Sequence, residues 1–392
     1  MAADTATLAG KLARAAPVLA SANTPCDDPD ALRTLRGRLG LSAGDFLVLF
    51  ASPLADVPRL AREAAEVFPG ITVIGCTTAG EITGAGYASR EIVAIGFPRS
   101  LFVCDTILVR NLREVDNHDL SYRVLRARAE LERREPGWQT EFAFTLIDGL
   151  SLAEDMLMGA LAMTMGPVPI FGGSAGDDVA FTRAFVLHEG ELLTDAAVVT
   201  LVRTRCRVKV FTLDHLSPTE AQMVVTGADP ARRLVTEINA EPAGREYARI
   251  LQKDPAQLDS MTFAAHPLLV RIGDTHHVRS IQRVNEDGHL VFHSAIAEGV
   301  VLTLARPEPI VAHLERELGR LAEGGAPASI LGFDCMLRRI EAEQTQEVGA
   351  LSRVLARHGV VGFNTYGEQF HATHVNQTLT GAAIYPPETE DQ

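Results

Sequence analysis

The sequence predicts a mixed α/β fold (α+β in part), built from repeated strand–helix–strand units. Three times along the chain, a short apolar run is followed by a stretch with helical spacing, a second apolar run and a Gly-rich loop with polar or acidic residues. A helix between two strands can cross over between parallel strands, and a mixed sheet fits the pattern equally well. The 392 residues, 46% of them hydrophobic, suffice for about two domains with separate cores. We therefore expect two related domains with mixed β-sheets flanked by helices.

The first unit follows a helix that we expect to end near Leu39, because acidic residues precede this helix and Gly40 follows it. Residues 46–50 (FLVLF) are a continuous apolar run, which is typical of a buried strand. Helical spacing returns over 56–67 and stops at a Pro-Gly pair. A second strand at 71–74 then leads into the first Gly-rich loop.

The other two units repeat this order. The second unit has a strand at 142–147, a helix at 151–165, a strand at 168–171 and the loop GGSAGDD at 172–178; the third has a strand at 329–333, a helix over about 335–357, a strand at 360–361 and the loop that starts at Gly362. More strand-like sequence follows each loop, so the third unit is expected to end the fold.

A domain boundary is predicted within residues 226–230 (TGADP), where Gly and Pro interrupt the pattern before a helical run at 231–239. The expected division is an N-terminal helical extension at 1–43, which includes an amphipathic helix over 7–20, a first domain at 44–228 and a second domain at 229–392. Further elements expected in the second domain are a helix near 245–252, a strand at 268–272, a hairpin through 286–288 and a helix at 310–321.

Composition argues against several classes of partner. The net charge of −14 makes nucleic acid an unlikely partner, because phosphate binding normally needs a basic face. No apolar run reaches the roughly 18 residues that a membrane span requires, so we expect no membrane insertion. The five cysteines are scattered and form no Cys-x-x-Cys pair, which favours a reducing cytoplasm.

Two of the loops match each other in register. Residues 73–81 (VIGCTTAGE) and 359–368 (GVVGFNTYGE) share the order Gly, Thr, Gly, Glu with the same spacing. The matched residues are Gly75, Thr78, Gly80 and Glu81 in the first loop and Gly362, Thr365, Gly367 and Glu368 in the second. We expect Glu81 to have a structural role, whereas Glu368 could either accept backbone hydrogen bonds or meet a polar ligand.

These motifs resemble the FIST family of bacterial sensory proteins, which carry an N-terminal and a C-terminal FIST domain. The N-terminal part fits about residues 44–225 through GCTTAGEI and FGGSAGDD, and the C-terminal part fits about 229–386 through GFNTYGEQF and HVNQTLTG. The resemblance implies a ligand-sensing module of signal transduction, without catalysis, that works with a separate histidine kinase or cyclic-di-GMP enzyme. The segment FDCMLRR at 333–339 looks like the subgroup that binds haem and senses nitric oxide. A homo-oligomer stays open.

His374 is the predicted haem ligand and metal-binding residue, with His371 as the second choice. A neutral imidazole can bind haem iron and leave the opposite face open to a diatomic gas. If the chain is a strand from Thr373 onward, His374 and Asn376 share one face. Asn376, Tyr366 and Glu368 complete the predicted cofactor-binding set. The alternative for His374 is a hydrogen-bonded role inside a polar loop.

Two other functions stay open on the sequence. A FIST sensor of a small metabolite such as an amino acid would use the Gly/Thr/Glu loops as polar contacts and would be colourless. A serine hydrolase would use Ser174 in the loop at 172–178, provided that a His and a carboxylate converge on it. Four methionines at 156–165 would suit a haem wall, but a buried core helix explains them at least as well.

Overall fold

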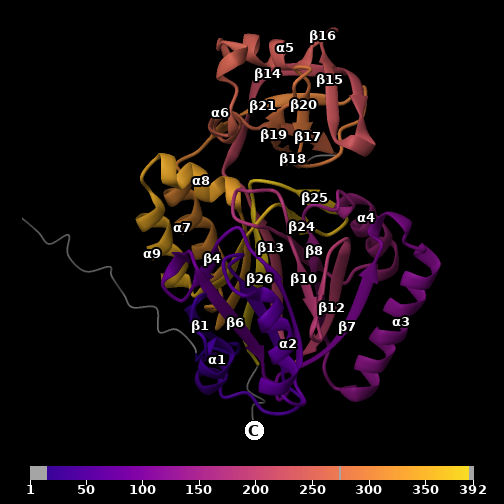
Figure 1. The fold of residues 1–392 in the computed structure, drawn as a ribbon, viewed down its shortest axis with the longest axis vertical. Helices are drawn as coiled ribbons and strands as arrows, with labels where there is room; N and C mark the ends of the chain where they lie inside the picture. Colours follow the sequence, from indigo (N-terminus) through magenta and orange to yellow (C-terminus); the bar gives the residue numbers. More distant parts are fainter. Residues whose placement is uncertain (1–15, 273–274, 388–392) are drawn as a thin grey trace, which may run out of the picture.

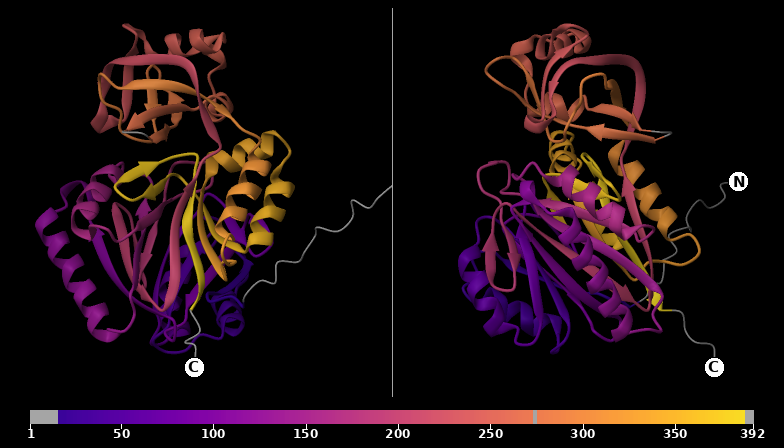
Figure 2. Two further views of the ribbon diagram at one scale, coloured as in Figure 1. Left: turned by 180° about the vertical axis from the view of Figure 1, so that it is seen from behind. Right: turned by 90° about the vertical axis from the view of Figure 1, so that its right-hand side faces the viewer.

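The computed structural model describes residues 16–272 and 275–387, which form a larger body of three six-stranded sheets and a smaller β-rich body (Figure 1). The mixed α/β class is confirmed. The smaller body lies between β13 and α7 in the sequence, and Figure 2 shows it over the hairpin of β24 and β25. We call the contact zone between the two bodies the seam.

The larger body consists of three units with one order of elements. The first is β1 (Ala20–Pro25), α1 (Ala31–Leu39), β2 (Phe46–Ala51), α2 (Val57–Val67), β3 (Thr72–Thr77), β4 (Glu81–Thr83), β5 (Gly86–Ala88) and β6 (Glu91–Phe97). The second is β7 (Phe102–Arg110), the 3₁₀ turn η1 (Leu112–Glu114), α3 (Asn117–Arg134), β8 (Thr140–Asp148), α4 (Glu154–Met165), β9 (Ile170–Ala175), β10 (Val186–His188), β11 (Glu191–Leu193) and β12 (Ala196–Thr204). The third is β13 (Cys206–Leu213), α7 (Ile310–Leu321), β22 (Ser329–Cys335), α8 (Met336–Gln344), α9 (Val348–His358), β23 (Val360–Thr365), β24 (Glu368–Phe370), β25 (Thr373–Val375) and β26 (Leu379–Pro387).

The β-hairpin of each unit pairs with the sheet of another unit. The sheets run β1-β6-β2-β3-β10-β11, β7-β12-β8-β9-β24-β25 and β13-β26-β22-β23-β4-β5. In all three, the two central strands are parallel and the other pairs are antiparallel. The hairpin of the first unit thus completes the third sheet, that of the third completes the second, and that of the second completes the first. The three units therefore exchange their hairpins in a cyclic, pseudo-threefold arrangement.

The three sheets enclose one central core and carry their helices outside. Phenylalanines from all three sheets meet there: the Phe50 ring lies 4.5 Å from the Phe363 ring, and Phe171 lies 5.2 Å from Phe333 between centroids. Outer cores form where α1 and α2 pack on the first sheet, α3 and α4 on the second, and α7 and α9 on the third. In α4, Met158 is buried and Met163 is 89% exposed, as in an ordinary amphipathic core helix.

The smaller body is built around a β-sheet with its own core. Its elements are β14 (Leu216–Asp229), η2 (Pro230–Arg232), β15 (Leu234–Ile238), β16 (Glu241–Pro242), α5 (Ala243–Leu251), η3 (Pro255–Gln257), α6 (Ser260–Ala265), β17 (Leu268–Ile272), β18 (Thr275–Arg279), β19 (Ile281–Val284), β20 (Leu290–Phe292) and β21 (Val301–Pro307). The predicted boundary at 228/229 falls within the antiparallel pair of β14 and β15.

Two predicted helices differ from the structure. The run at 231–239 is mostly the strand β15, because its buried Leu234 and Val235 pair with β14 and β20 instead of forming a helical stripe. The single helix predicted over 335–357 is two helices, which separate at residues 345–347, where Gln346 has a φ of 60°. Most of the helix predicted over 7–20 lies outside the described residues, and Ala20 begins β1.

Candidate ligand-binding site

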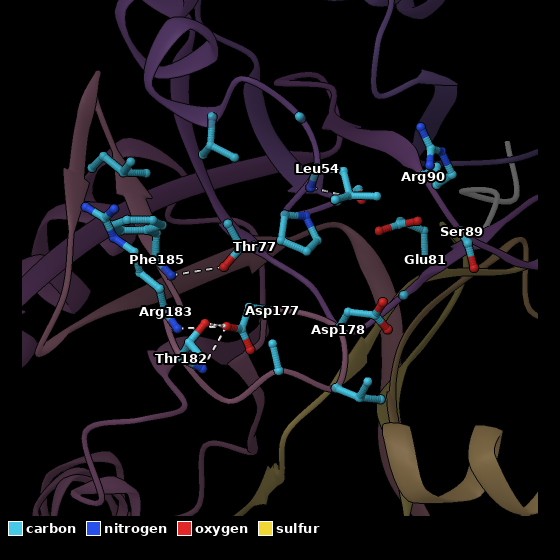
Figure 3. A pocket seen from close by; sticks show the side chains of 18 of the residues that line it. Leu54, Thr77, Glu81, Ser89, Arg90, Asp177, Asp178, Thr182, Arg183 and Phe185 are labelled. Carbon is cyan, nitrogen blue, oxygen red and sulfur yellow. Dashed lines mark hydrogen bonds between the residues drawn. The ribbon is translucent and has the colours of Figure 1, made fainter.

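A cavity of about 540 Å³ opens at the carboxyl ends of the parallel strands β2 and β3. It lies between the start of α2 and the loop that follows β9, and we call it the β2–β3 pocket (Figure 3). Its apolar lining includes Leu54, Val57, Val179 and Phe185. Ligands of open α/β sheets bind at this edge, and an apolar cavity with a few convergent polar groups is the usual form of a small-molecule site.

Charged groups stand at opposite ends of the β2–β3 pocket. Figure 3 shows the carboxylates of Glu81 and Asp178 on one side, with Arg90 beside Glu81, and the Arg183 side chain with Phe185 on the other. The Arg183 guanidinium lies 4.7 Å from the centre of the Phe185 ring, which fixes it by a cation–π contact. The arrangement can therefore hold a ligand that carries a positive group at one end and a negative group at the other.

Glu81 is a buried acid at the wall of this pocket, with 1% of its surface exposed. It accepts hydrogen bonds from the Thr78 hydroxyl at 2.5 Å and the Glu91 amide at 3.2 Å. Burial raises the pKa of Glu81 to about 7, although these hydrogen bonds oppose the rise. Glu81 can thus exist in either protonation state near neutral pH.

Asp177, which is one of the lining residues, organises the loop at the pocket. Its carboxylate accepts from the Thr182 amide at 2.8 Å, the Thr182 hydroxyl at 2.7 Å and the Arg183 amide at 2.7 Å. The Tyr366 hydroxyl also donates to it and accepts from the amides of Asp177 and Phe181, each at 3.1 Å. Tyr366, a predicted cofactor-binding residue, therefore holds the pocket loop from the third unit.

Glu368 has the same local contacts as Glu81, as the repeat predicts. Thr365 donates to its carboxylate as Thr78 does to Glu81, and the Thr378 amide and hydroxyl donate at 3.2 and 2.8 Å. Glu368 is fully buried, and burial raises its pKa to about 8. Glu368 does not line the β2–β3 pocket, and its hydrogen bonds join the third loop to Thr378, the residue just before β26.

His374 and Asn376 are brought together near Gly367, but His371 is not. A Cβ on Gly367 would lie 2.7 Å from His374 Nε2 and 3.0 Å from Asn376 Nδ2. His374 is 1% exposed, burial lowers its pKa, and its Nδ1 lies 3.3 Å from Gln369 Nε2. Both side-chain polar atoms of Asn376 are buried without a partner in the described residues. His371 is exposed between β24 and β25, with a φ of 50°.

Ser174 is buried in a polar network at the seam. Its hydroxyl donates to Glu154 at 3.3 Å and accepts from Gln369 Nε2 at 3.0 Å, and neither partner is an imidazole. Glu154 in turn forms a buried ion pair with Arg233 of the smaller body. The hydrolase alternative therefore finds no support in this arrangement, in which Ser174 helps to join the two bodies.

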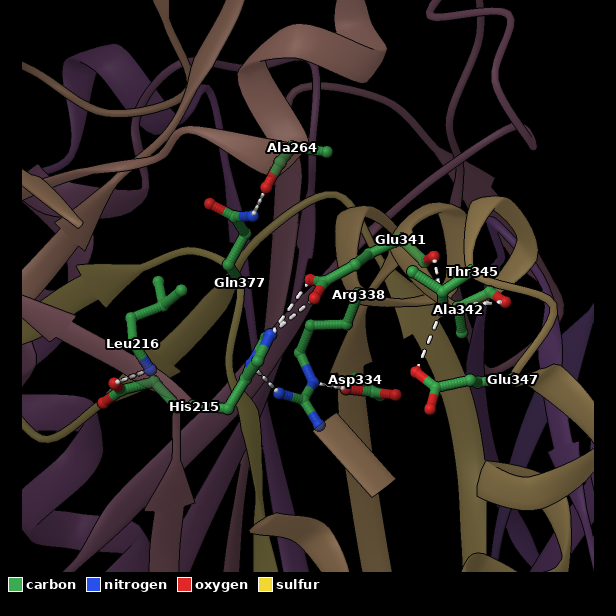
Figure 4. A network of polar contacts seen from close by, with 11 residues as sticks. His215, Leu216, Ala264, Asp334, Arg338, Glu341, Ala342, Thr345, Glu347 and Gln377 are labelled. Atoms are coloured by element: carbon green, nitrogen blue, oxygen red, sulfur yellow. Dashed lines mark hydrogen bonds and ion pairs between the residues drawn. The ribbon is translucent and has the colours of Figure 1, made fainter. Parts of the chain in front are cut away.

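Another buried network, which sequence reasoning missed, lies at the carboxyl end of β22 (Figure 4). Arg338 donates to Asp334 at 2.8 Å and to His215 Nδ1 at 2.9 Å, so the His215 proton is on Nε2, which donates to Glu341 at 2.9 Å. Asp334 and Arg338 are four residues apart across the start of α8, and this spacing was the available signal. The network ties the chain after β13 to α8.

Among the described residues, no group of three or more His, Cys, Asp or Glu side chains is placed to hold a metal ion. The cysteines in this part of the chain are unpaired, and Cys104 is the one that is not buried. Within residues 16–272 and 275–387, no helix is long and apolar enough to cross a membrane.

The protein has a mixed α/β fold, and the β2–β3 pocket is its candidate ligand-binding site. The FIST N domain matches residues 45–241 and the FIST C domain matches residues 243–371. The chain belongs to the FIST family, and its domains imply the role of a signalling sensor. It is also similar to the uncharacterized protein MJ1623 of Methanocaldococcus jannaschii, with 23% identity over 289 residues. That match covers 67% of this chain and 54% of the relative, so the chain spans about half of the relative's length.

Proposed function

We propose that this chain senses a small polar metabolite, such as an amino acid, in the β2–β3 pocket. The observation that carries the proposal is a cavity of about 540 Å³ at the carboxyl ends of two parallel strands, with two acids and Arg90 at one end and Arg183 at the other. Glu81 and Asp178 receive the ammonium group, Arg183 binds the carboxylate, and Leu54 and Val179 cover the apolar part of the ligand.

The signal passes from the pocket to the third unit through Asp177 and Tyr366. A ligand that contacts Asp178 and Arg183 orders the loop that Asp177 holds. This loop is hydrogen-bonded directly to Tyr366. The output is a surface read by a separate histidine kinase or cyclic-di-GMP enzyme in the cytoplasm, the partner classes and compartment that the sequence favours. This proposal needs no cofactor.

Thermal unfolding with a panel of amino acids, amines and carboxylates tests the proposal. A ligand at 100 times its Kd stabilises a protein by about 2.7 kcal/mol, which gives a readily measured rise in Tm. We expect the rise to be lost in Glu81→Gln and Arg183→Gln and kept in Glu66→Gln, an exposed change on α2. A ligand whose effect is equal in all three variants binds elsewhere, and a panel without any effect removes amino acids from the proposal.

Haem with nitric oxide as the signal stays a prediction, and the residues described here do not fit haem. His374 packs on Gly367, where a Cβ would lie 2.3 Å from His374 Cε1, and it is not part of the described lining of the β2–β3 pocket. The described lining of the β2–β3 pocket contains no His, Cys, Met or Tyr to bind iron. An absorption spectrum of the protein expressed with haem precursor tests this prediction. A Soret band that is lost in His374→Ala would show that the chain binds haem through His374, contrary to what this geometry suggests.

A further inference from the structure

A second cavity, of about 280 Å³, crosses the seam between the two bodies. Arg113 of η1 and Leu152, just before α4, come from the larger body. Arg232 of η2, Arg283 of β19 and Asn285 come from the smaller body. We call this cavity the arginine cleft. It shares no lining residue with the β2–β3 pocket.

The arginine cleft is positively charged although the protein carries a net charge of −14. Its described lining has three arginines and no carboxylate. Arg113 donates its Nε to the Ser151 carbonyl at 3.2 Å, and in the described part of the chain no ion pair joins Arg113, Arg232 or Arg283 to an acid. The three arginines line one small cleft from separate elements, so an anion bound there is attracted by all three positive charges.

A buried ion pair lies next to both sides of the arginine cleft. Arg233, the neighbour of Arg232, is 4% exposed and forms the buried ion pair with Glu154. It has a φ of 54°, and its amide donates to Pro230 at 3.1 Å. On the other side, Leu152 has a φ of 59°, an uncommon conformation for a side chain with a Cβ, and Glu154 follows two residues later. The ion pair between Arg233 and Glu154 thus fixes the two sides of the cleft relative to each other.

We propose that the arginine cleft binds a phosphate-bearing anion, which is a site separate from the sensing pocket of the proposed function. Planar guanidinium groups match the geometry of phosphate oxygens, and Asn285 adds a donor. Since one water occupies about 30 Å³ in the liquid, the cleft has space for a mono- or diphosphate group. The bound anion contacts both bodies and therefore strengthens their attachment.

Isothermal titration of pyrophosphate into the full chain, in a chloride buffer of low ionic strength, tests this site. We expect saturable binding with one site per chain. Arg232→Gln and Arg283→Gln should each weaken binding at least about tenfold, which is about 1.4 kcal/mol, because each removes a charge-assisted hydrogen bond to the anion. The matched control Arg245→Gln, an exposed change on α5 outside the described lining of the cleft, should bind as the natural chain does.

The remaining outcomes distinguish the two cavities. Absence of saturable binding, or equal affinity in Arg232→Gln and Arg283→Gln, would overturn the proposal. Loss of pyrophosphate binding in Arg183→Gln, with the two cleft variants unaffected, would place the anion in the β2–β3 pocket and also overturn it. Inorganic phosphate that binds as tightly as pyrophosphate would support recognition of a single phosphate group, whereas tighter pyrophosphate would support a metabolite with linked phosphates.

Discussion

Gly75 and Gly362 occupy equivalent positions, each pressed against a carbonyl of the neighbouring parallel strand. A Cβ on Gly75 would lie 2.1 Å from the Leu49 oxygen, and a Cβ on Gly362 would lie 1.8 Å from the Gly332 oxygen. Gly172 stands at the same place in the second sheet, where a Cβ would lie 1.9 Å from Thr145 Oγ1. The spacing of the Gly/Thr/Glu repeat is therefore set by close packing of strands as well as by the loops.

Replacement of Gly75 or Gly362 by Ala should destabilise the fold strongly. The added methyl group meets backbone that a side-chain rotation cannot move, so we expect a loss of at least about 3 kcal/mol in urea unfolding. Gly159→Ala is the control, because a Cβ there meets nothing within 4 Å and Ala favours the helix. Equal stability of all three variants would show that these strands do not pack as described.

Single and double substitutions of the buried ion pair between Arg233 and Glu154 should have different effects on the stability of the fold. Arg233→Met leaves an unpaired carboxylate beside Ser174, which typically costs about 3–5 kcal/mol. Arg233→Met combined with Glu154→Leu removes both charges and should recover much of this loss. A double-mutant cycle by denaturant unfolding measures the coupling, and a coupling near zero would mean that the pair does not join the two bodies.

Glu81→Gln should alter the pH dependence of stability. The folded-state pKa of Glu81 is raised from 4.5 to about 7, so ionising it in the folded protein has a cost that is absent below about pH 4.5 and complete above about pH 7. The variant should gain stability relative to the natural chain as pH rises through this window, by up to about 3 kcal/mol. Urea unfolding at pH 5 and pH 8 checks this, with Glu66→Gln as control; an unchanged difference at the two pH values would contradict it.

Tyr366→Phe should loosen the loop of the β2–β3 pocket. The change removes a donor to Asp177 and leaves the amides of Asp177 and Phe181 without an acceptor, so a loss of about 1–3 kcal/mol is expected. Affinity for the metabolite should fall as well, although Tyr366 does not line the pocket. Tyr122→Phe, at a residue that is 64% exposed, should change neither property. If Tyr366→Phe left the affinity for the metabolite unaltered, Tyr366 would not couple the pocket loop to the third unit.

The sequence predicted many of the individual helices and strands, but it did not predict which distant segments of the chain come together. Apolar runs such as 46–50 and the helix stop at Gly40 depend on neighbouring residues, and both are found as predicted. The equivalence of Glu81 and Glu368 followed from the spacing of the repeat. The β2–β3 pocket was missed because Ser89 and Arg183 reach it from loops that only the folded sheets bring together. The burial of His374 likewise depends on β9, which is distant in sequence and pairs with the hairpin of β24 and β25.

Hairpin exchange makes the order of synthesis matter for this chain. When the ribosome has finished the first unit, β3 still lacks β10, and β4 and β5 must wait for β23, which is made almost last. The nascent protein therefore presents unpaired strand edges until its C-terminal strands emerge, a state that favours association with other chains. A fragment cut between the two FIST domains would keep this exposure permanently, because β9 would lack β24 and β13 would lack β26.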